Sequence, residues 1–190
     1  MPDPEPFVGE PLALDLVNTR PFSDGDPVDL IGSPEALHAW LMLQVGRLPG
    51  FPVEDAERLS ASDLVPILEI RDHTAAIIEC VRHGRLPPVA ALYGLNAALR
   101  AAPAVRALTL EDGAIRSTVR RAGSPGLRLA ACLADATADL VSGLTTRHIR
   151  QCAAEDCTML FLATNQRRRW CSSARCGNRS RVAHYYRRHR

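Results

Sequence analysis

Residues 152–176 read CAAEDCTMLFLATNQRRRWCSSARC and hold four of the six cysteines of the chain. These four form two pairs of identical spacing, Cys152 with Cys157 and Cys171 with Cys176. Two short cysteine pairs separated by a little over a dozen residues are typical of a site in which four thiolates surround one metal ion. Zinc accepts four thiolates in tetrahedral geometry without strain. The spacing therefore predicts one structural zinc ion at this point of the chain.

Disulfides and an iron–sulfur cluster are the alternative uses of these cysteines. The chain begins with an acidic, proline-rich segment, unlike the basic and apolar parts of a secretory signal. We therefore expect a cytoplasmic protein, in a reducing compartment where disulfides are rare. Iron–sulfur clusters usually have ligands at other spacings. No apolar run reaches the ~18 residues of a membrane-spanning helix, so we expect no contact with a membrane.

The residues around the cysteines predict a small module that depends on its metal for stability. An apolar run at residues 159–162 and Trp170 supply its large side chains, and residues 163–169 form a polar loop. After Cys176, residues 177–190 have helical spacing. One side of this helix holds Val182, Tyr185, Tyr186 and His189, and the other holds Arg181, His184, Arg187 and Arg188. The module implied is treble-clef-like, with a β-hairpin and the start of a helix supplying the ligands.

The basic residues of the chain are concentrated in its last quarter. Residues 147–190 contain 11 arginines against two acidic residues, a formal charge of +9. Residues 1–146 contain 12 arginines against 19 acidic residues, a formal charge of −7. A concentrated basic block is typical of a protein that binds a polyanion. The alternative is that the tail docks on the acidic remainder of the chain.

We therefore expect the tail to bind duplex DNA, and the bound protein to associate with the bacterial nucleoid. The predicted contacts to phosphates or guanine edges are Arg167, Arg168, Arg169, Arg179, Arg181, Arg187 and Arg188. A single small module binds weakly, so a homodimer would help by doubling the contacts. Two other partners stay open, namely an RNA or ribosomal site and an acidic protein surface.

At these residues the sequence resembles a known family, the CGNR zinc fingers. Residues 176–179 read CGNR, the motif that names the family, and RWCS at residues 169–172 precedes it. The first cysteine pair, in RQCAAEDC at residues 150–157, is also similar to the family. The loop at residues 163–169 has less glycine and serine than the family pattern, which puts the role of this loop in DNA binding in doubt.

In that family the zinc finger usually follows an ABATE domain, and the first part of this chain resembles one. The stretch LALDLVNT at residues 12–19 is similar to its opening motif, and Arg71 and Leu95-Asn96 stand where the family has an arginine and a Leu-Asn pair. The resemblance implies a stress-associated or ligand-responsive transcription regulator. It divides the chain into an ABATE-like, ligand-sensing domain at 1–146 and a CGNR-type zinc finger at 147–190.

The expected fold is α+β, with a mainly helical N-terminal domain that carries a small β-hairpin. Ser or Pro signals and apolar periodicity predict helices at 33–46, 63–82, 88–101 and 124–143. Strands at 106–110 and 114–120 flank a turn glycine. Residues 11–19 fit a strand or a helix, and the junction to the zinc finger falls at 145–149. We expect the two domains to have separate cores, so that Cys171→Ser unfolds only the tail.

Nothing in the sequence predicts an enzyme. Glycine-rich phosphate loops, HExxH and Gly-x-Ser-x-Gly are all missing from the sequence. Four cysteine ligands also close the coordination shell, which predicts a structural zinc ion. Asp15, Asn18 and Arg71 are polar residues in apolar surroundings and are our candidates for binding a small effector. The alternative is that each caps a helix or pairs within the core.

Overall fold

The computed structural model describes residues 6–23 and 26–188 of the chain. Its helices are α1 (Leu12–Val17), α2 (Pro34–Met42), α3 (Ala61–Val81), α4 (Val89–Ala101), α5 (Pro125–Ser142) and α6 (Asn178–Arg188). Its strands are β1 (Phe22–Ser23), β2 (Asp26–Pro27), β3 (Val105–Glu111), β4 (Ala114–Arg120), β5 (Ile149–Gln151) and β6 (Leu160–Leu162). The strands pair as three antiparallel hairpins. Among the described helices, none combines the length and the apolarity that crossing a bilayer requires.

Local signals in the sequence start the main helices. The Ser33 hydroxyl accepts a hydrogen bond from the Ala36 amide at 3.2 Å and caps α2, whose first residue is Pro34. Ser124 caps α5 in the same way, with Pro125 in the first turn. The serine hydroxyl accepts a hydrogen bond from one unpaired amide of the first turn, and the proline has no amide N–H that needs a partner. These two features explain why the helices begin at these residues.

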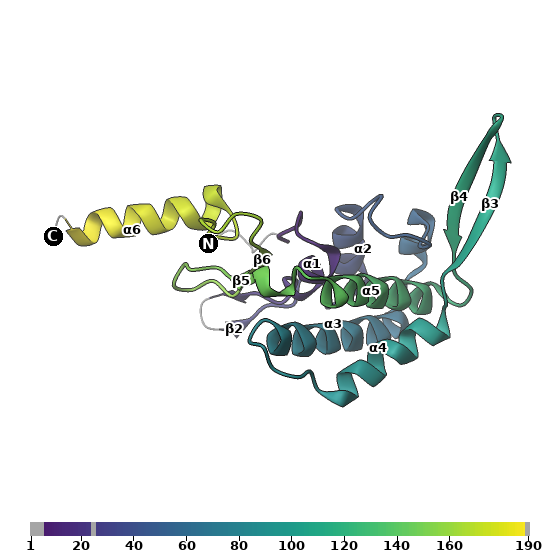
Figure 1. The fold of residues 1–190 in the computed structure, drawn as a ribbon, viewed down its shortest axis with the longest axis horizontal. Helices are drawn as coiled ribbons and strands as arrows, with labels where there is room; N and C mark the ends of the chain where they lie inside the picture. Colours follow the sequence, from purple (N-terminus) through teal and green to yellow (C-terminus); the bar gives the residue numbers. More distant parts are fainter. Residues whose placement is uncertain (1–5, 24–25, 189–190) are drawn as a thin grey trace.

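The body of the molecule is formed by α1, α3, α4 and α5, which pack side by side (Figure 1). Its core includes Ile67, Ile77, Leu129 and Leu133, together with Trp40 from α2, all of which are almost completely buried. The two ends of the molecule differ. The β3–β4 hairpin extends from one end and α6 extends from the other (Figure 1).

A second group of buried apolar side chains joins the body to the zinc finger. Leu14 of α1, Ile78 of α3 and Leu140 of α5 pack against Ile149 of β5 and Leu160 of β6. The expectation of two separate cores is therefore wrong. Leu14 lies more than a hundred positions from Ile149 and Leu160 in sequence, and local patterns do not show such contacts.

The α+β fold class is confirmed, including the treble-clef-like tail. The four helices predicted at 33–46, 63–82, 88–101 and 124–143 are present with ends shifted by up to four residues. The hairpin predicted at 106–120 is also present. Residues 12–17 are helical, which decides the segment that the sequence left open between strand and helix.

Candidate metal centre and its contacts with the body

Three short segments bring the four cysteines together. Cys152 and Cys157 lie in the loop between β5 and β6, and the Cys152 amide donates to the Met159 carbonyl at 2.9 Å to close that loop. Cys171 lies in the following loop. Cys176 lies in a helical turn, Ser173–Gly177, that leads directly into α6. A hairpin loop supplies two ligands, the following loop supplies the third, and the turn that begins α6 supplies the fourth, an arrangement like that of a treble clef.

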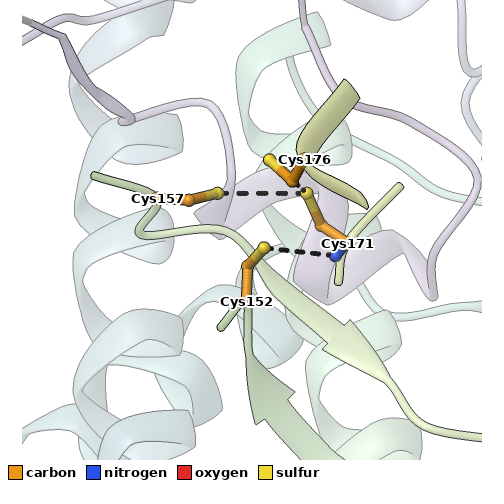
Figure 2. Close-up of side chains that lie close together, drawn as sticks. All are labelled: Cys152, Cys157, Cys171 and Cys176. Carbon is orange, nitrogen blue, oxygen red and sulfur yellow. Dashed lines mark hydrogen bonds between the residues drawn. The ribbon is translucent and has the colours of Figure 1, made fainter. Parts of the chain in front are cut away.

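The spacing of the sulfur atoms fits one tetrahedral zinc ion. The four Sγ atoms all lie within 4.8 Å of one another. The Cys157 and Cys171 sulfurs are 3.9 Å apart, and those of Cys171 and Cys176 are 3.6 Å apart (Figure 2). Four ligands at ~2.3 Å from a tetrahedral centre lie about 3.8 Å apart, so these distances match a zinc–thiolate site. The cysteines are free thiols in this geometry, not disulfides.

Electrostatics also favour a cation at this position. A hydrogen bond with Cys171 lowers the pKa of the Cys157 thiol, and the same bond raises the pKa of Cys171. Burial raises the pKa of Cys176 to about 11. One thiolate therefore opposes ionisation of its neighbours, and four thiolates become stable together only around a positive ion.

The interior of the finger is small and apolar. Phe161 of β6 is fully buried against the cysteines, with Met159 and Trp170 packed partly over them. Phe7, from the segment that precedes α1, packs on the same group. The body of the molecule thus contributes directly to the packing around the metal ligands.

Asn18, at the end of α1, makes the most direct polar link between the body and the finger. Its Nδ2 donates to the Leu160 carbonyl at 2.8 Å, and its Oδ1 accepts from the Leu160 amide at 2.8 Å. The side chain is buried. Asn18 therefore pairs with both backbone groups of one residue of β6, as a neighbouring strand would.

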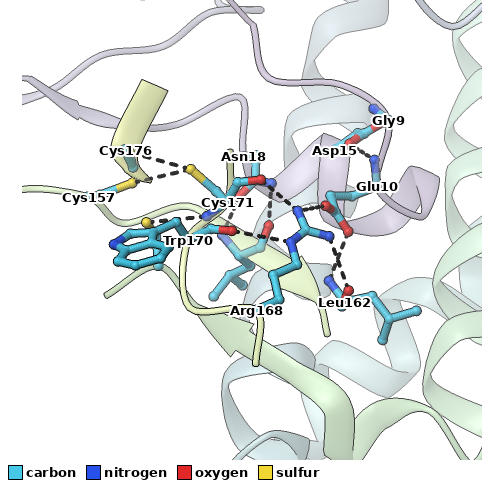
Figure 3. Close-up of polar contacts among 12 residues, drawn as sticks. Gly9, Glu10, Asp15, Asn18, Cys157, Leu162, Arg168, Trp170, Cys171 and Cys176 are labelled. Carbon is cyan, nitrogen blue, oxygen red and sulfur yellow. Dashed lines mark hydrogen bonds and ion pairs between the residues drawn. The ribbon is translucent and has the colours of Figure 1, made fainter. Parts of the chain in front are cut away.

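Glu10 and Arg168 form the second link, which reaches a metal ligand (Figure 3). Glu10 accepts from the Leu162 amide at 2.8 Å and from Arg168 at 2.5 Å. The Arg168 guanidinium also donates to the Cys171 carbonyl at 2.6 Å and lies over the Phe161 ring. One buried carboxylate thereby orients the arginine that holds the backbone of the third ligand.

Two family models match successive parts of the chain. A model described as "Putative stress-induced transcription regulator", ABATE, matches residues 10–144. The chain belongs to the ABATE family. A second model, the CGNR zinc finger, matches residues 148–189 and contains all four cysteines. No curated protein matches the chain. The resemblance drawn from the sequence is confirmed, and the four cysteines form the site of one structural zinc ion.

Within the ABATE region, the candidate ligand contacts all have partners in the chain itself. Asp15 is fully buried, accepts from the Glu10 amide at 3.0 Å and pairs with Arg47 at 2.6 Å. Arg71 is buried and makes a two-point ion pair with Asp29, at 2.7 and 2.6 Å. These contacts are structural, and binding of an effector by Asp15, Asn18 or Arg71 stays a prediction.

Within the CGNR finger, the arginines predicted to bind nucleic acid fall into three groups. Arg167, Arg169, Arg179 and Arg181 are exposed. Arg168 is the exception, because Glu10 and the Cys171 carbonyl engage its guanidinium. The side chains of Arg187 and Arg188 lie outside the described part of the structure. The same holds for Tyr186, His184 and His189, so only part of the predicted apolar and basic sides of α6 is described.

Sequence reasoning missed Glu10, the residue on which the second link depends. It stands two residues before the first residue of the ABATE opening motif, in a segment that shows no periodicity. Asp15 determines its position, because the Asp15 carboxylate accepts from the amides of Gly9 and Glu10, each at 3.0 Å. Glu10 stands five residues before Asp15, but the sequence does not show that either carboxylate is buried, so it held no signal for this link.

Proposed function

We propose that this ABATE protein is a zinc-dependent transcription regulator that binds duplex DNA through its CGNR finger and has no catalytic activity. The observation that carries the proposal is the position of α6. It projects from the body (Figure 1), and its first turns present the exposed Arg179 and Arg181. Cys176 lies in the turn that precedes this helix, so the metal site fixes its start.

The charges near the metal site favour a polyanion as the partner. Arg167 and Arg169 are exposed in the loop that leads to Cys171, close in sequence to the metal site from which α6 begins. Two residues on the predicted apolar side of α6, Val182 and Tyr185, are 54% and 61% exposed, so the body does not bury them. A helix that is anchored at one end and whose described side chains are mostly exposed can enter a groove of DNA without displacing other elements.

The salt dependence of binding tests the proposal. If Arg167, Arg169, Arg179 and Arg181 each neutralise one phosphate, log affinity should fall with log salt with a slope of about −3.6, and any contact from the end of α6 would make it steeper. Replacing Arg167 and Arg169 together by alanine should flatten the slope by about 1.8. Fluorescence anisotropy with a labelled duplex of mixed sequence measures both values.

A matched control removes the same charge from the body. Arg58 is 75% exposed at its side chain and Arg100 is exposed on α4, so the double alanine variant should leave the slope unchanged. Equal flattening in both variants would show that the effect is only one of net charge, and the proposed surface would be wrong. Tighter binding of structured RNA than of duplex DNA at equal salt would point to the RNA alternative. Binding that is insensitive to salt and requires an acidic protein would point to the protein-interaction alternative.

A further inference from the structure

A cavity of about 400 Å³ lies at the base of the β3–β4 hairpin, where the hairpin meets α5, the start of α1 and the loop after α2. Part of its lining is apolar and comes from all four segments, namely Leu12, Pro49, Val119 and Ala136. Cavities of ~300–1,000 Å³ that combine apolar walls with a few polar groups are typical of small-molecule sites. This cavity is therefore large enough for a small organic molecule.

Five charged residues also line the cavity, and three of them are already paired. Arg47 is paired with the fully buried Asp15 at 2.6 Å, and Arg121 is paired with Asp135. The side chains of Arg47 and Asp135 are nevertheless 33% and 42% exposed. Both can therefore contact a bound molecule while they keep their partners.

The other two charged residues of the lining, Arg106 and Asp139, have no ion pair within residues 6–23 and 26–188. Arg106 makes one hydrogen bond, to the Ser117 hydroxyl at 3.0 Å. Both residues are exposed, so a molecule in the cavity reaches them without displacing other side chains. The cavity thus offers one positive and one negative charge that the described chain does not neutralise.

These opposite charges identify the class of ligand. A purely anionic molecule would lie close to Asp135 and Asp139, and a purely cationic one would lie close to Arg47 and Arg106, which costs free energy in a partly enclosed site. We propose that the cavity binds a small zwitterion with an apolar body, such as an apolar amino acid or a short apolar peptide. Its carboxylate contacts Arg106 and Arg47, whose planar guanidinium groups suit a carboxylate, and its ammonium group contacts Asp139 and Asp135.

Arg47 also connects the cavity to the zinc finger. Its guanidinium donates to the Glu10 carbonyl and to Asp15, and the Asp15 carboxylate accepts from the Glu10 amide at 3.0 Å. The Glu10 carboxylate in turn holds Arg168, which donates to the Cys171 carbonyl (Figure 3). A ligand that contacts Arg47 stabilises the conformation in which these contacts are intact. Occupancy of the cavity should therefore slow the loss of zinc from the finger.

Isothermal titration calorimetry on the full zinc-loaded protein tests the site. The probes are alanine, valine, leucine, methionine, phenylalanine and the dipeptide leucylleucine, each up to about 10 mM, and we expect a dissociation constant of about 1 mM or lower for at least one of them. The better binder of leucine and leucylleucine shows whether an amino acid or a peptide fits. Leucinamide and N-acetylleucine each lack one of the two charges and should bind at least about fivefold more weakly than leucine. Absence of binding by every probe, or equal binding of leucine and its two uncharged-end analogues, would overturn the proposal.

Two single variants test the residues. Arg106→Ala and Asp139→Asn should each weaken binding of the best probe by at least about fivefold. The matched controls, Arg100→Ala and Glu57→Gln, remove the same charges from exposed positions outside the cavity and should leave the affinity unchanged. All four positions are exposed, so the melting temperature and the zinc content should not change. Undiminished binding in Arg106→Ala and Asp139→Asn would show that the probe binds elsewhere, and the proposed site would be wrong.

Transfer of zinc to a chromogenic chelator tests the connection through Arg47. At about ten times its dissociation constant, the best probe should slow the transfer by about two- to tenfold in the wild type. The same probe concentration should have little effect in Arg106→Ala, where the cavity is mostly empty. A probe that binds but leaves the rate unchanged in the wild type would overturn the connection between cavity and finger. None of these outcomes depends on whether the finger binds DNA.

Discussion

The link between Asn18 and β6 makes a quantitative prediction about the coupling of the finger to the body. Asn18→Ala removes both hydrogen bonds to Leu160, each 2.8 Å long, and leaves the Leu160 amide and carbonyl without partners in a buried position. Each unsatisfied buried polar group costs about 1–3 kcal/mol. The free energy of unfolding should therefore fall by about 2–6 kcal/mol, a large part of the ~5–15 kcal/mol that stabilises a typical protein.

Thermal unfolding and the rate of zinc transfer both measure the effect of Asn18→Ala. In thermal unfolding monitored by circular dichroism, a loss of ~3 kcal/mol should lower the melting temperature by about 6–12 °C in a chain of this size. The wild type should unfold in one transition, because body and finger share a core. Transfer of zinc to a chromogenic chelator should be faster in Asn18→Ala, because β6 carries Phe161, which packs against the ligands.

A second asparagine in the finger provides the control. Asn165 accepts a hydrogen bond from the Arg167 amide at 2.8 Å, but in an exposed loop. Asn165→Ala should therefore cost less than about 1 kcal/mol, since water replaces the lost partner. If Asn18→Ala changes neither the melting temperature nor the rate of zinc transfer by more than this control, the link does not couple the two parts and the reasoning is refuted.

Three further predictions concern the metal, an ion pair and a close contact between helices. Purified protein should contain about one zinc ion per chain, and Cys171→Ser should lose the metal and also lower the melting temperature of the body, which mass spectrometry and circular dichroism would show. The hydrogen bonds from Arg71 lower the pKa of Asp29 in the folded state. This ion pair therefore stabilises the folded protein at pH values above the ordinary aspartate pKa, and the stabilisation is lost as the pH falls through the lowered pKa. In urea unfolding at pH 2–5, the free energy of unfolding of Asp29→Asn should therefore depend less on pH than that of the wild type. A Cβ on Gly126 would lie 2.7 Å from the Asp63 Cβ, so Gly126→Ala should destabilise the protein by about 1–3 kcal/mol in urea unfolding.

Features set by neighbouring residues could be predicted from the sequence. The cysteine spacing gave the zinc ligands, because short pairs bring two sulfurs to one side of a turn. Ser33 and Ser124 marked the starts of α2 and α5 because a cap acts within one helical turn. The residues Asp112 and Gly113 predicted the turn of the β3–β4 hairpin, because a tight two-residue turn requires a positive φ at both positions and these residue types tolerate it.

The contacts between body and finger could not be predicted in this way. Asn18 and Leu160 are 142 residues apart, and Glu10 and Arg168 are 158 apart. Arg167, Arg168 and Arg169 look equivalent in sequence, yet the structure engages Arg168 in the link and leaves the other two exposed. Their different roles depend on which side of the loop faces Glu10, and side-chain chemistry alone does not contain that information.

The two links determine how the finger would present α6 in the DNA binding that we propose. A finger on a flexible linker samples many orientations, whereas this one is held by Asn18, by Glu10 and by shared apolar packing. The direction of α6 is therefore fixed relative to the body, and through the body relative to the β3–β4 hairpin. It follows that any effector which loosens Glu10 or Asn18 would weaken the proposed DNA binding without touching the DNA-binding surface itself.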